Sequence, residues 1–162
     1  METKIIQEDW VLITYDIPAK DKKLRNEFIR DAKQLGAIPH TDSVYLMPYS
    51  EKAMQLAAEL AEKGHAVVWR SKQEDKQKAI EITTTYNSAL SARCDYLEQR
   101  LQIGSQHIMA GNLKMALRMG VKTGKLLREL VEISTTYNPQ WLGERIQQIM
   151  AKWKEVYSAY AE

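Results

Sequence analysis

The chain has 162 residues, of which 44% are hydrophobic and 27% are charged, and its formal net charge is +2. This length and composition allow one globular domain or two small ones, and the near-neutral charge excludes a protein that attracts polyanions through its overall charge. No apolar run approaches the roughly 20 residues that cross a bilayer, which excludes a membrane span. The N-terminal segment lacks the apolar core of a signal peptide, and the single cysteine, Cys94, cannot form an internal disulfide. We therefore expect a cytoplasmic protein with no membrane partner.

The first half of the chain alternates between the patterns of strands and helices. Residues 10–17 are rich in β-branched and aromatic side chains, which is typical of a buried strand. Residues 21–35 carry apolar side chains spaced mostly three and four apart, and Gly36 follows as the expected end of a helix. A short extended piece at residues 37–40 then leads to a second clear strand at residues 43–47.

A second helix and a further strand complete this half. Ser50 is the expected N-terminal cap of a helix that ends at Gly64, and residues 66–69 have the composition of a strand. The order of elements is the ferredoxin-like βαββαβ pattern. We therefore predict an antiparallel four-stranded sheet within a domain of residues 9–72, with both helices on one face of the sheet.

The second half has helical patterns without strand alternation. Helices are predicted at residues 74–101, 108–133 and 140–160, so that residues 73–162 form a helical extension. The predicted fold class is therefore α+β. Three glycines lower the helix propensity of the middle segment: Gly111, Gly120 and Gly124.

Two nearly identical heptapeptides lie in this half. EITTTYN at residues 81–87 and EISTTYN at residues 132–138 differ at one position, and the similarity does not continue outward. We interpret the pair as chance or as a shared role at helix ends, and not as a duplication. The β-branched run makes both segments weak helix formers.

Positive charge is concentrated in the second half. Residues 1–73 contain 11 basic and 11 acidic residues, whereas no acidic residue lies between Glu98 and Glu129. At about 100° per residue, five basic side chains of that stretch fall within roughly a third of the circumference of a helix. They are Lys114, Arg118, Lys122, Lys125 and Arg128. Such a face can lie along a phosphate backbone, can meet an acidic patch of a protein partner, or can simply be solvated; the absence of acids favours nucleic acid, with DNA expected.

Asp16 closes the first predicted strand and has two interpretations. Two such carboxylates meeting at a dimer interface could hold Mg²⁺, which could then activate water against a phosphodiester. In the alternative, the side chain accepts hydrogen bonds from backbone N–H groups in a turn before Pro18. Because the only other acids nearby are Asp21 and Asp42, and because no His or Cys pair has ligand spacing, we favour the turn. We expect no catalytic residue and no cofactor, with Mg²⁺ belonging to the nuclease alternative alone.

The strand ending in YDI and the strand SVYLM resemble the small CRISPR-associated spacer-acquisition protein. In that family the strand-end aspartate, matched here by Asp16, can bind Mg²⁺ at a dimer axis. Some members are described as metal-dependent nucleases, and others are structural partners of an integrase. This resemblance covers only the ferredoxin-like half of the chain.

A second resemblance, to the N-terminal domain of the chromate-resistance regulator ChrB, covers nearly the whole chain. It rests on WVLITYDIP, on Gly36-Ala37, on DSVYLMP at residues 42–48, on GHAVVW, and more loosely on residues 93–98 and 127–133. Ser43 in place of a glycine, and the acid at Asp16, depart from that family's pattern. The resemblance implies a nucleic-acid-associated regulator linked to chromate resistance.

We therefore expect a non-enzymatic regulatory protein that contacts DNA through the basic helix. The alternatives are a Mg²⁺-dependent nuclease centred on Asp16 and a protein-interaction module. Because edge strands of a sheet can pair with those of another copy, we expect a homodimer in each case.

Overall fold

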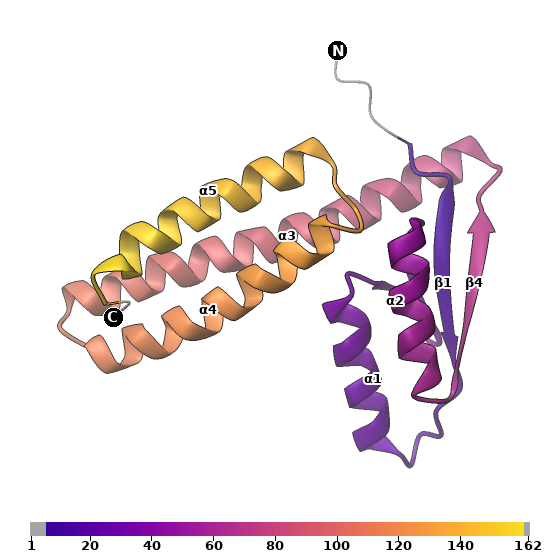
Figure 1. The fold of residues 1–162 in the computed structure, drawn as a ribbon, viewed down its shortest axis with the longest axis horizontal. Helices are drawn as coiled ribbons and strands as arrows, with labels where there is room; N and C mark the ends of the chain where they lie inside the picture. Colours follow the sequence, from indigo (N-terminus) through magenta and orange to yellow (C-terminus); the bar gives the residue numbers. More distant parts are fainter. Residues whose placement is uncertain (1–5, 161–162) are drawn as a thin grey trace. The chain divides into compact units, whose positions relative to one another are not determined.

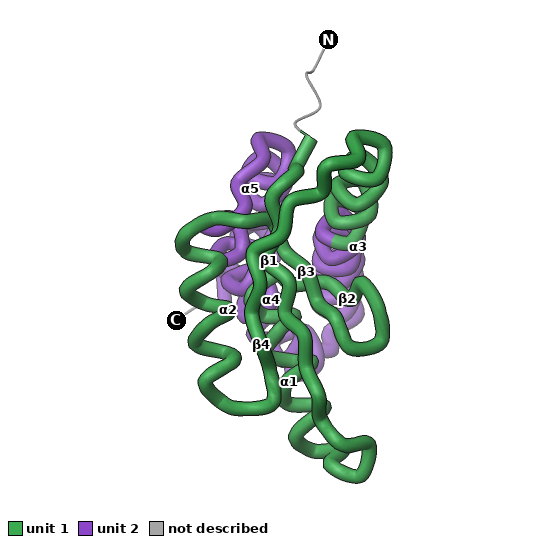
Figure 2. Tube along the Cα trace, turned by 90° about the vertical axis from the view of Figure 1, so that its right-hand side faces the viewer, with its two compact units in different colours: residues 1–89 green, residues 90–162 purple. Residues whose placement is uncertain are grey.

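The computed structural model describes residues 6–160, and the fold is the predicted α+β fold (Figure 1). The elements of the first half are β1 (Asp9–Tyr15), α1 (Lys22–Gln34), β2 (Ile38–Thr41), β3 (Val44–Pro48), α2 (Glu51–Glu62) and β4 (Ala66–Lys72). Those of the second half are α3 (Lys76–Met109), α4 (Leu113–Ser134), α5 (Gln140–Tyr157) and the 3₁₀ turn η1 (Ser158–Tyr160). The chain divides within α3 into two compact units, Met1–Ala89 and Leu90–Glu162 (Figure 2). Among the described helices, none has the length and apolar content that a bilayer span requires.

The four strands form one antiparallel sheet in the order β2-β3-β1-β4. The central strand β1 pairs with β3 and β4, so that Trp10 lies opposite Pro48 on one side and Ser71 on the other. This order and these directions confirm the ferredoxin-like prediction. The strand β4 lies at an edge of the sheet.

One face of the sheet is covered by α1 and α2, which lie on the same side of it (Figure 1). Alternate residues of a strand point to the same face, and Ile13 and Tyr15 of β1 are both buried. The ring of Phe28 in α1 lies 4.7 Å from that of Tyr15 and 6.4 Å from that of Tyr45, centroid to centroid. This aromatic cluster is the centre of the core between the sheet and α1.

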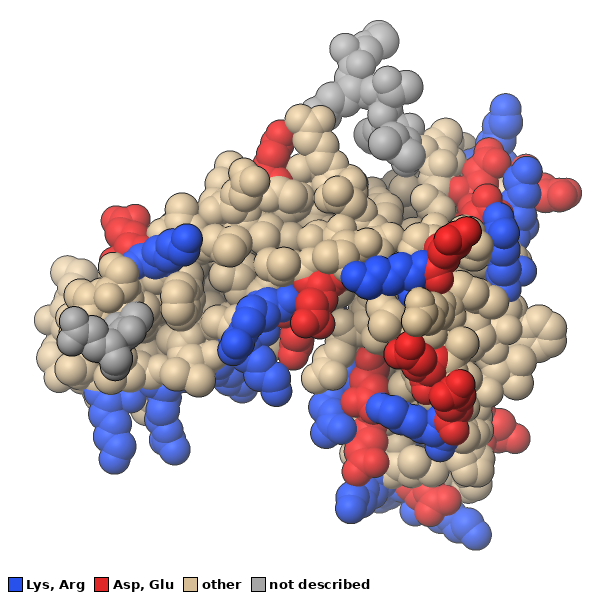
Figure 3. Space-filling view, viewed as in Figure 1, with Lys and Arg blue, Asp and Glu red and all other residues tan. Residues whose placement is uncertain are grey.

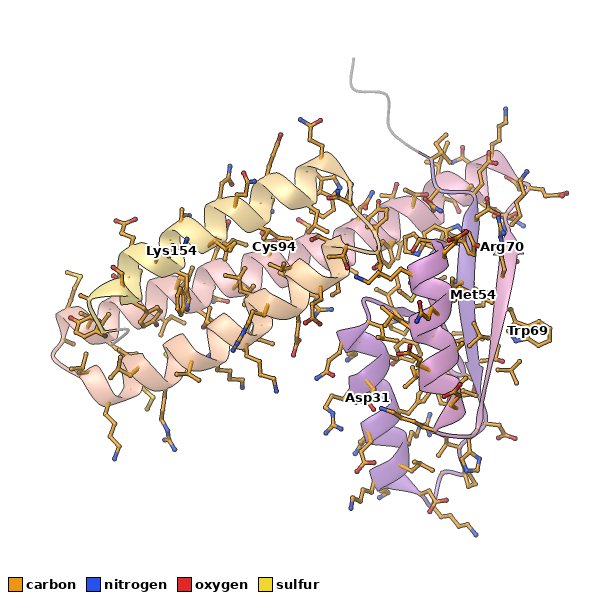
Figure 4. The ribbon with its side chains drawn as sticks, in the orientation of Figure 1. Asp31, Met54, Trp69, Arg70, Cys94 and Lys154 are labelled. Carbon is orange, nitrogen blue, oxygen red and sulfur yellow. The ribbon has the colours of Figure 1, made fainter. Side chains whose placement is uncertain are left out.

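The opposite face is covered in part by the start of α3. The ring of Tyr86 packs edge-on against Trp10 at 5.8 Å, and both residues are buried. Farther along this face, on β4, Val67 is 53% exposed and Trp69 is 54% exposed. Figure 4 shows that Trp69 points away from α1 and α2.

The predicted ends of the first two helices are confirmed. Ser50 caps α2, because its Oγ accepts a hydrogen bond of 3.0 Å from the backbone N–H of Ala53. Gly36 follows α1 with φ 91°, and Gly64 follows α2 with φ 100°. Both angles lie in the left-handed region, which glycine adopts without a steric cost.

The predicted boundary between the first two helices of the second half, at residues 101–108, is wrong. Helix α3 continues to Met109, and α4 begins only at Leu113. The turn is made by Gly111, with φ 77°, whose N–H donates to the Ile108 carbonyl at 3.0 Å. The next N–H, of Asn112, donates to the His107 carbonyl at 2.8 Å, which completes a Schellman motif.

The unit of residues 90–162 is built from α4, α5 and the later part of α3. Each helix buries one stripe, and the largest fully buried side chains here are Leu90, Leu97, Leu130, Ile133, Leu142 and Ile149. Two glycines allow the aromatic end of α5 to pack closely: Tyr157 lies directly against Gly104 of α3 and Gly120 of α4. The indole N–H of Trp153 donates to the Gly120 carbonyl at 3.1 Å.

A charged contact fixes the other end of α5. The guanidinium of Arg145 donates to the Asp95 carboxylate at 2.8 Å, and it lies 3.4 Å from Glu98. It also donates to Ser91 Oγ at 3.4 Å, so that one side chain of α5 joins three residues of α3. The Asp95 hydrogen bond is the main cause that raises the pKa of Arg145.

Candidate nucleic-acid interface

Helix α4 has a buried side and an exposed basic side. Ala116, Thr123, Leu127 and Leu130 are buried at helical spacing. The five predicted contact residues lie on the other side of the helix and all are exposed: Lys114, Arg118, Lys122, Lys125 and Arg128. We call these five residues the basic stripe. The structure therefore places all of them on one accessible surface.

The charges of the basic stripe are not neutralised within the described part of the chain. None of the five side chains makes an ion pair or a hydrogen bond there. The nearest acid in sequence, Glu129, pairs instead with Arg93 at 3.6 Å. Figure 3 shows basic side chains projecting from the lower edge of the helical unit, where Figure 1 places α4. Such cations are free to meet an anionic ligand.

Apolar residues are also exposed on α4. Val121 is 74% exposed and falls within the arc of the basic stripe by helical spacing, whereas Leu117 is 36% exposed and lies at its edge. The sequence pattern placed Leu113 away from the stripe, and Leu113 is 41% exposed at the start of the helix. The surface of α4 is therefore mixed, basic and aliphatic, and not purely charged.

Arg100 is a further cation of this unit that lies outside the basic stripe. It belongs to α3, where its Nε donates to Thr123 Oγ1 at 3.1 Å and its Nη1 donates to the Tyr96 hydroxyl at 3.3 Å. Its guanidinium lies 5.6 Å from the centre of the Tyr96 ring. Arg100 lies in the acid-free stretch between Glu98 and Glu129, so the sequence marks it as a cation without a nearby acid. Its contact with α4 depends on the packing of the two helices and is not visible in the sequence.

Asp16 is exposed at the end of β1, and its backbone N–H donates to the His65 carbonyl at 2.9 Å. Its carboxylate makes no hydrogen bond within residues 6–160, so the turn predicted from its side chain is wrong: the backbone holds this corner. Among the same residues, no group of three or more His, Cys, Asp or Glu side chains could hold a metal ion. The described residues of one chain thus bring no ligand cluster to Asp16, and a Mg²⁺ site there stays a prediction in which a second copy would add a further carboxylate.

Comparison with known proteins gives one finding for the first half of the chain. Residues 4–83 match the family model described as the PaaX protein central Cas2-like domain. No curated protein and no solved structure gives a significant match. The match supports the resemblance of the first half to the small CRISPR-associated spacer-acquisition protein, which is Cas2. It gives no support to ChrB or to chromate resistance. Residues 4–83, which include the whole sheet and the first turns of α3, are therefore similar to the central Cas2-like domain of PaaX proteins.

Proposed function

We propose that this chain is a regulatory, nucleic-acid-associated protein that holds DNA phosphates with the basic stripe of α4. The observation that carries the proposal is the exposure of five cations on one side of one helix, without an acidic partner in the described residues. The similarity of residues 4–83 to a domain of PaaX proteins supports a regulatory role at the level of the family.

The dimensions of the stripe suit a duplex. From Lys114 to Arg128 the helix rises by about 21 Å, which is about the length of six base pairs at 3.4 Å each. Lysine and arginine that neutralise phosphates release condensed counterions, and this release strengthens binding at low salt. Contacts of this kind position the protein on DNA and carry no sequence information by themselves.

Titration of a fluorescein-labelled duplex of about 20 base pairs, followed by anisotropy, tests the proposal. The double variant Arg118→Glu/Lys125→Glu reverses two charges near the middle of the stripe and should weaken binding by about tenfold or more. Lys20→Glu/Lys23→Glu is the matched control, because both lysines are exposed in the other unit and make no ion pair in the described residues. Unchanged binding of the stripe variant, or an equal loss in the control, would contradict the proposal.

We also propose that the protein is a homodimer. The support is the edge strand β4, whose outer side faces no other strand of the described residues and which carries the exposed Val67 and Trp69. Sedimentation equilibrium of the chain and of Val67→Lys/Trp69→Lys tests this. A monomeric wild-type chain rejects the dimer, and a dimer that survives both substitutions rejects β4 as its interface.

A further inference from the structure

A second surface of the helical unit is apolar. A groove with a volume of about 240 Å³ lies between α3 and α4. Its lining residues are Ala92, Arg93, Tyr96, Leu97, Leu126 and Leu130. All of them belong to the unit of residues 90–162, so the groove is a feature of that unit alone.

The apolar surface continues along both helices beyond the groove. On α3, Ile103 follows Tyr96 by seven residues, or two turns, and the two side chains are 37% and 48% exposed. On α4, Met115 precedes Leu126 by eleven residues, or three turns, and is 43% exposed. An aromatic, an isoleucine and a methionine thus share one face of the α3–α4 pair.

Helix α5 does not cover this face. Its contacts with α3 include Asp95, Glu98 and, at the far end, Gly104, and its contacts with α4 include Gly120 and Gly124. On a helix, Asp95 points about 100° away from its neighbour Tyr96, so that α5 and the groove occupy different sides of α3. Within the unit of residues 90–162, the pair α3–α4 therefore has one side occupied by α5 and another side that α5 leaves open.

The free charges at the border of the groove are positive. Arg93 is paired with Glu129, but among residues 6–160 Arg100 bonds only to the uncharged Thr123 and Tyr96. Lys122, one turn before Leu126, has no ion pair in the part of the chain that the structure describes. A helix on each side of the groove thus supplies one uncompensated cation.

We propose that this groove binds an amphipathic helix of a protein partner, with an apolar stripe against Tyr96, Ile103, Met115 and Leu126 and with acidic side chains at its margins. A groove between two antiparallel helices can accept the apolar face of a third helix. This is a common way in which proteins recognise amphipathic helices. The uncompensated Arg100 and Lys122 select acidic margins by charge complementarity.

Two other occupants fit the surface less well. A phosphate backbone uses the cations but leaves the apolar lining uncovered. A second copy that docked the same face symmetrically would bring the cations of both copies, Arg100 and Lys122, into one interface, and like charges there are unfavourable. An acidic amphipathic helix uses both features at once.

A designed peptide tests the proposal. The probe is a fluorescein-labelled helix of about 18 residues with leucine at positions i, i+3, i+4 and i+7 and glutamate at the flanking positions. Its partner peptide carries lysine in place of every glutamate. We expect the acidic peptide to bind the full chain at least about tenfold more tightly than the basic one.

Matched variants place the binding in the groove. Ile103→Gln/Met115→Gln should weaken binding of the acidic peptide by about tenfold or more, because both apolar contacts are lost. The control Ile80→Gln/Met109→Gln changes the same residue types at exposed sites outside the groove, and Ile80 is as exposed as Ile103 at 37%. Circular dichroism of each variant checks that the substitutions leave the fold intact.

The outcomes are distinct from those for DNA binding. Failure of the acidic peptide to bind, equal binding of the basic peptide, or equal loss in the control variant would overturn the proposal. A change in sedimentation of Ile103→Gln/Met115→Gln alone would assign the groove to a second copy and would also overturn it. Duplex binding should be unchanged in this variant, so the proposal can fail while the proposed function stands.

Discussion

The phenol of Tyr86 donates a hydrogen bond of 2.6 Å to the carbonyl oxygen of Gly36, and both residues are buried. Gly36 makes the turn after α1, whereas Tyr86 lies in α3, 50 residues later in the chain. Together with the ring contact between Tyr86 and Trp10, this bond joins the first turns of α3 to the sheet. The start of α3 is therefore part of the first unit.

Substitution Tyr86→Phe should lower the free energy of unfolding by about 1–3 kcal/mol, because the Gly36 carbonyl would stay buried without this donor. Urea denaturation measures the change. Tyr160→Phe is the control, since Tyr160 is 40% exposed, and its effect should be within about 0.5 kcal/mol. Equal stability of Tyr86→Phe and wild type would show that water replaces the phenol.

The two glycines beneath Tyr157 should not tolerate alanine. A Cβ at Gly120 would lie 2.7 Å from a carbon of the Tyr157 ring, and a Cβ at Gly104 would meet the Tyr157 hydroxyl directly. We expect each alanine to lower the unfolding free energy by about 1–3 kcal/mol. Gly143→Ala is the control: its Cβ would meet nothing closer than 4.0 Å, and a helical alanine should stabilise by up to about 1 kcal/mol.

The same contact predicts a specific coupling. The Tyr157 hydroxyl is buried and has no hydrogen-bond partner in the described structure, so Tyr157→Phe alone should not destabilise the fold. In the Tyr157→Phe background, Gly104→Ala should lower the unfolding free energy by less, because the hydroxyl oxygen that its Cβ would meet is gone. Gly120→Ala should cost the same, since it meets the ring. A double-mutant cycle with equal coupling for both glycines would contradict this geometry.

The free energy of unfolding should fall at alkaline pH. Burial is the main cause that raises the pKa of the Cys94 thiol, with Arg145 acting against it, and burial likewise raises the pKa of Tyr157. Above the ordinary pKa of each group, the unfolded chain has lost a proton that the folded chain retains. The contribution is therefore fully present only well below the ordinary pKa, about 8.5 for a thiol and about 10 for a phenol, and is lost as pH rises, by up to about 1.4 kcal/mol per group and pH unit.

Urea denaturation between about pH 8 and pH 10.5 measures this slope. Tyr157→Phe and Cys94→Ala should each make the decline shallower, whatever their effect at neutral pH. A slope that is the same in both variants and in wild type would assign the decline to other groups.

The salt dependence of DNA binding should report the number of stripe contacts. Lys114→Gln and Lys125→Gln should each reduce the magnitude of the slope of log K against log salt concentration by about 0.9. Lys20→Gln should leave the slope unchanged, because Lys20 lies in the other unit. Slopes that do not respond to the stripe variants would show that the contacts are elsewhere.

The nuclease alternative has a separate test at Asp16. Because this side chain is exposed and makes no hydrogen bond in the described residues, Asp16→Asn should change the unfolding free energy by less than about 0.5 kcal/mol. Loss of Mg²⁺-dependent cleavage in this variant would then report on chemistry and not on unfolding. Cleavage that survives the substitution would remove Asp16 from the mechanism.

The sequence was sufficient where a local signal sets the structure. Ser50 predicted a cap, and Gly36 and Gly64 predicted helix ends, because each of these roles depends on the residue itself and its immediate neighbours. Helical spacing also placed the five basic residues on one side of a helix. The buried residues of α4 lie on its other side, so that the basic side faces outward.

The sequence was insufficient where tertiary contacts decide. Gly104 and Gly120 have low helix propensity, yet both lie inside helices. Tyr157 occupies the space that a side chain at either position would fill, and this contact is invisible in the sequence. The groove beside Tyr96 and Leu126 could not be predicted, since it depends on which faces of α3 and α4 are left uncovered by α5.

The repeated heptapeptide shows the same limit. Residues 81–87 lie inside α3, where the hydroxyls of Thr83 and Thr85 bond to carbonyls four residues earlier. Residues 132–138 run past the end of α4, and Pro139 disfavours a helical conformation at the residue before it. A shared role at helix ends is therefore wrong for the first copy, because the residues on the C-terminal side of each heptapeptide decide whether its helix continues.

The packing of the aromatic residues also provides optical reporters. Trp10 is 3% exposed in the first unit, whereas Trp153 bonds to Gly120 in the second. Indole emission shifts to longer wavelength when the ring enters water, so each tryptophan reports on its own surroundings. With Trp69, Trp141 and one of these two reporters replaced by phenylalanine, fluorescence of the remaining tryptophan would follow the melting of its own unit.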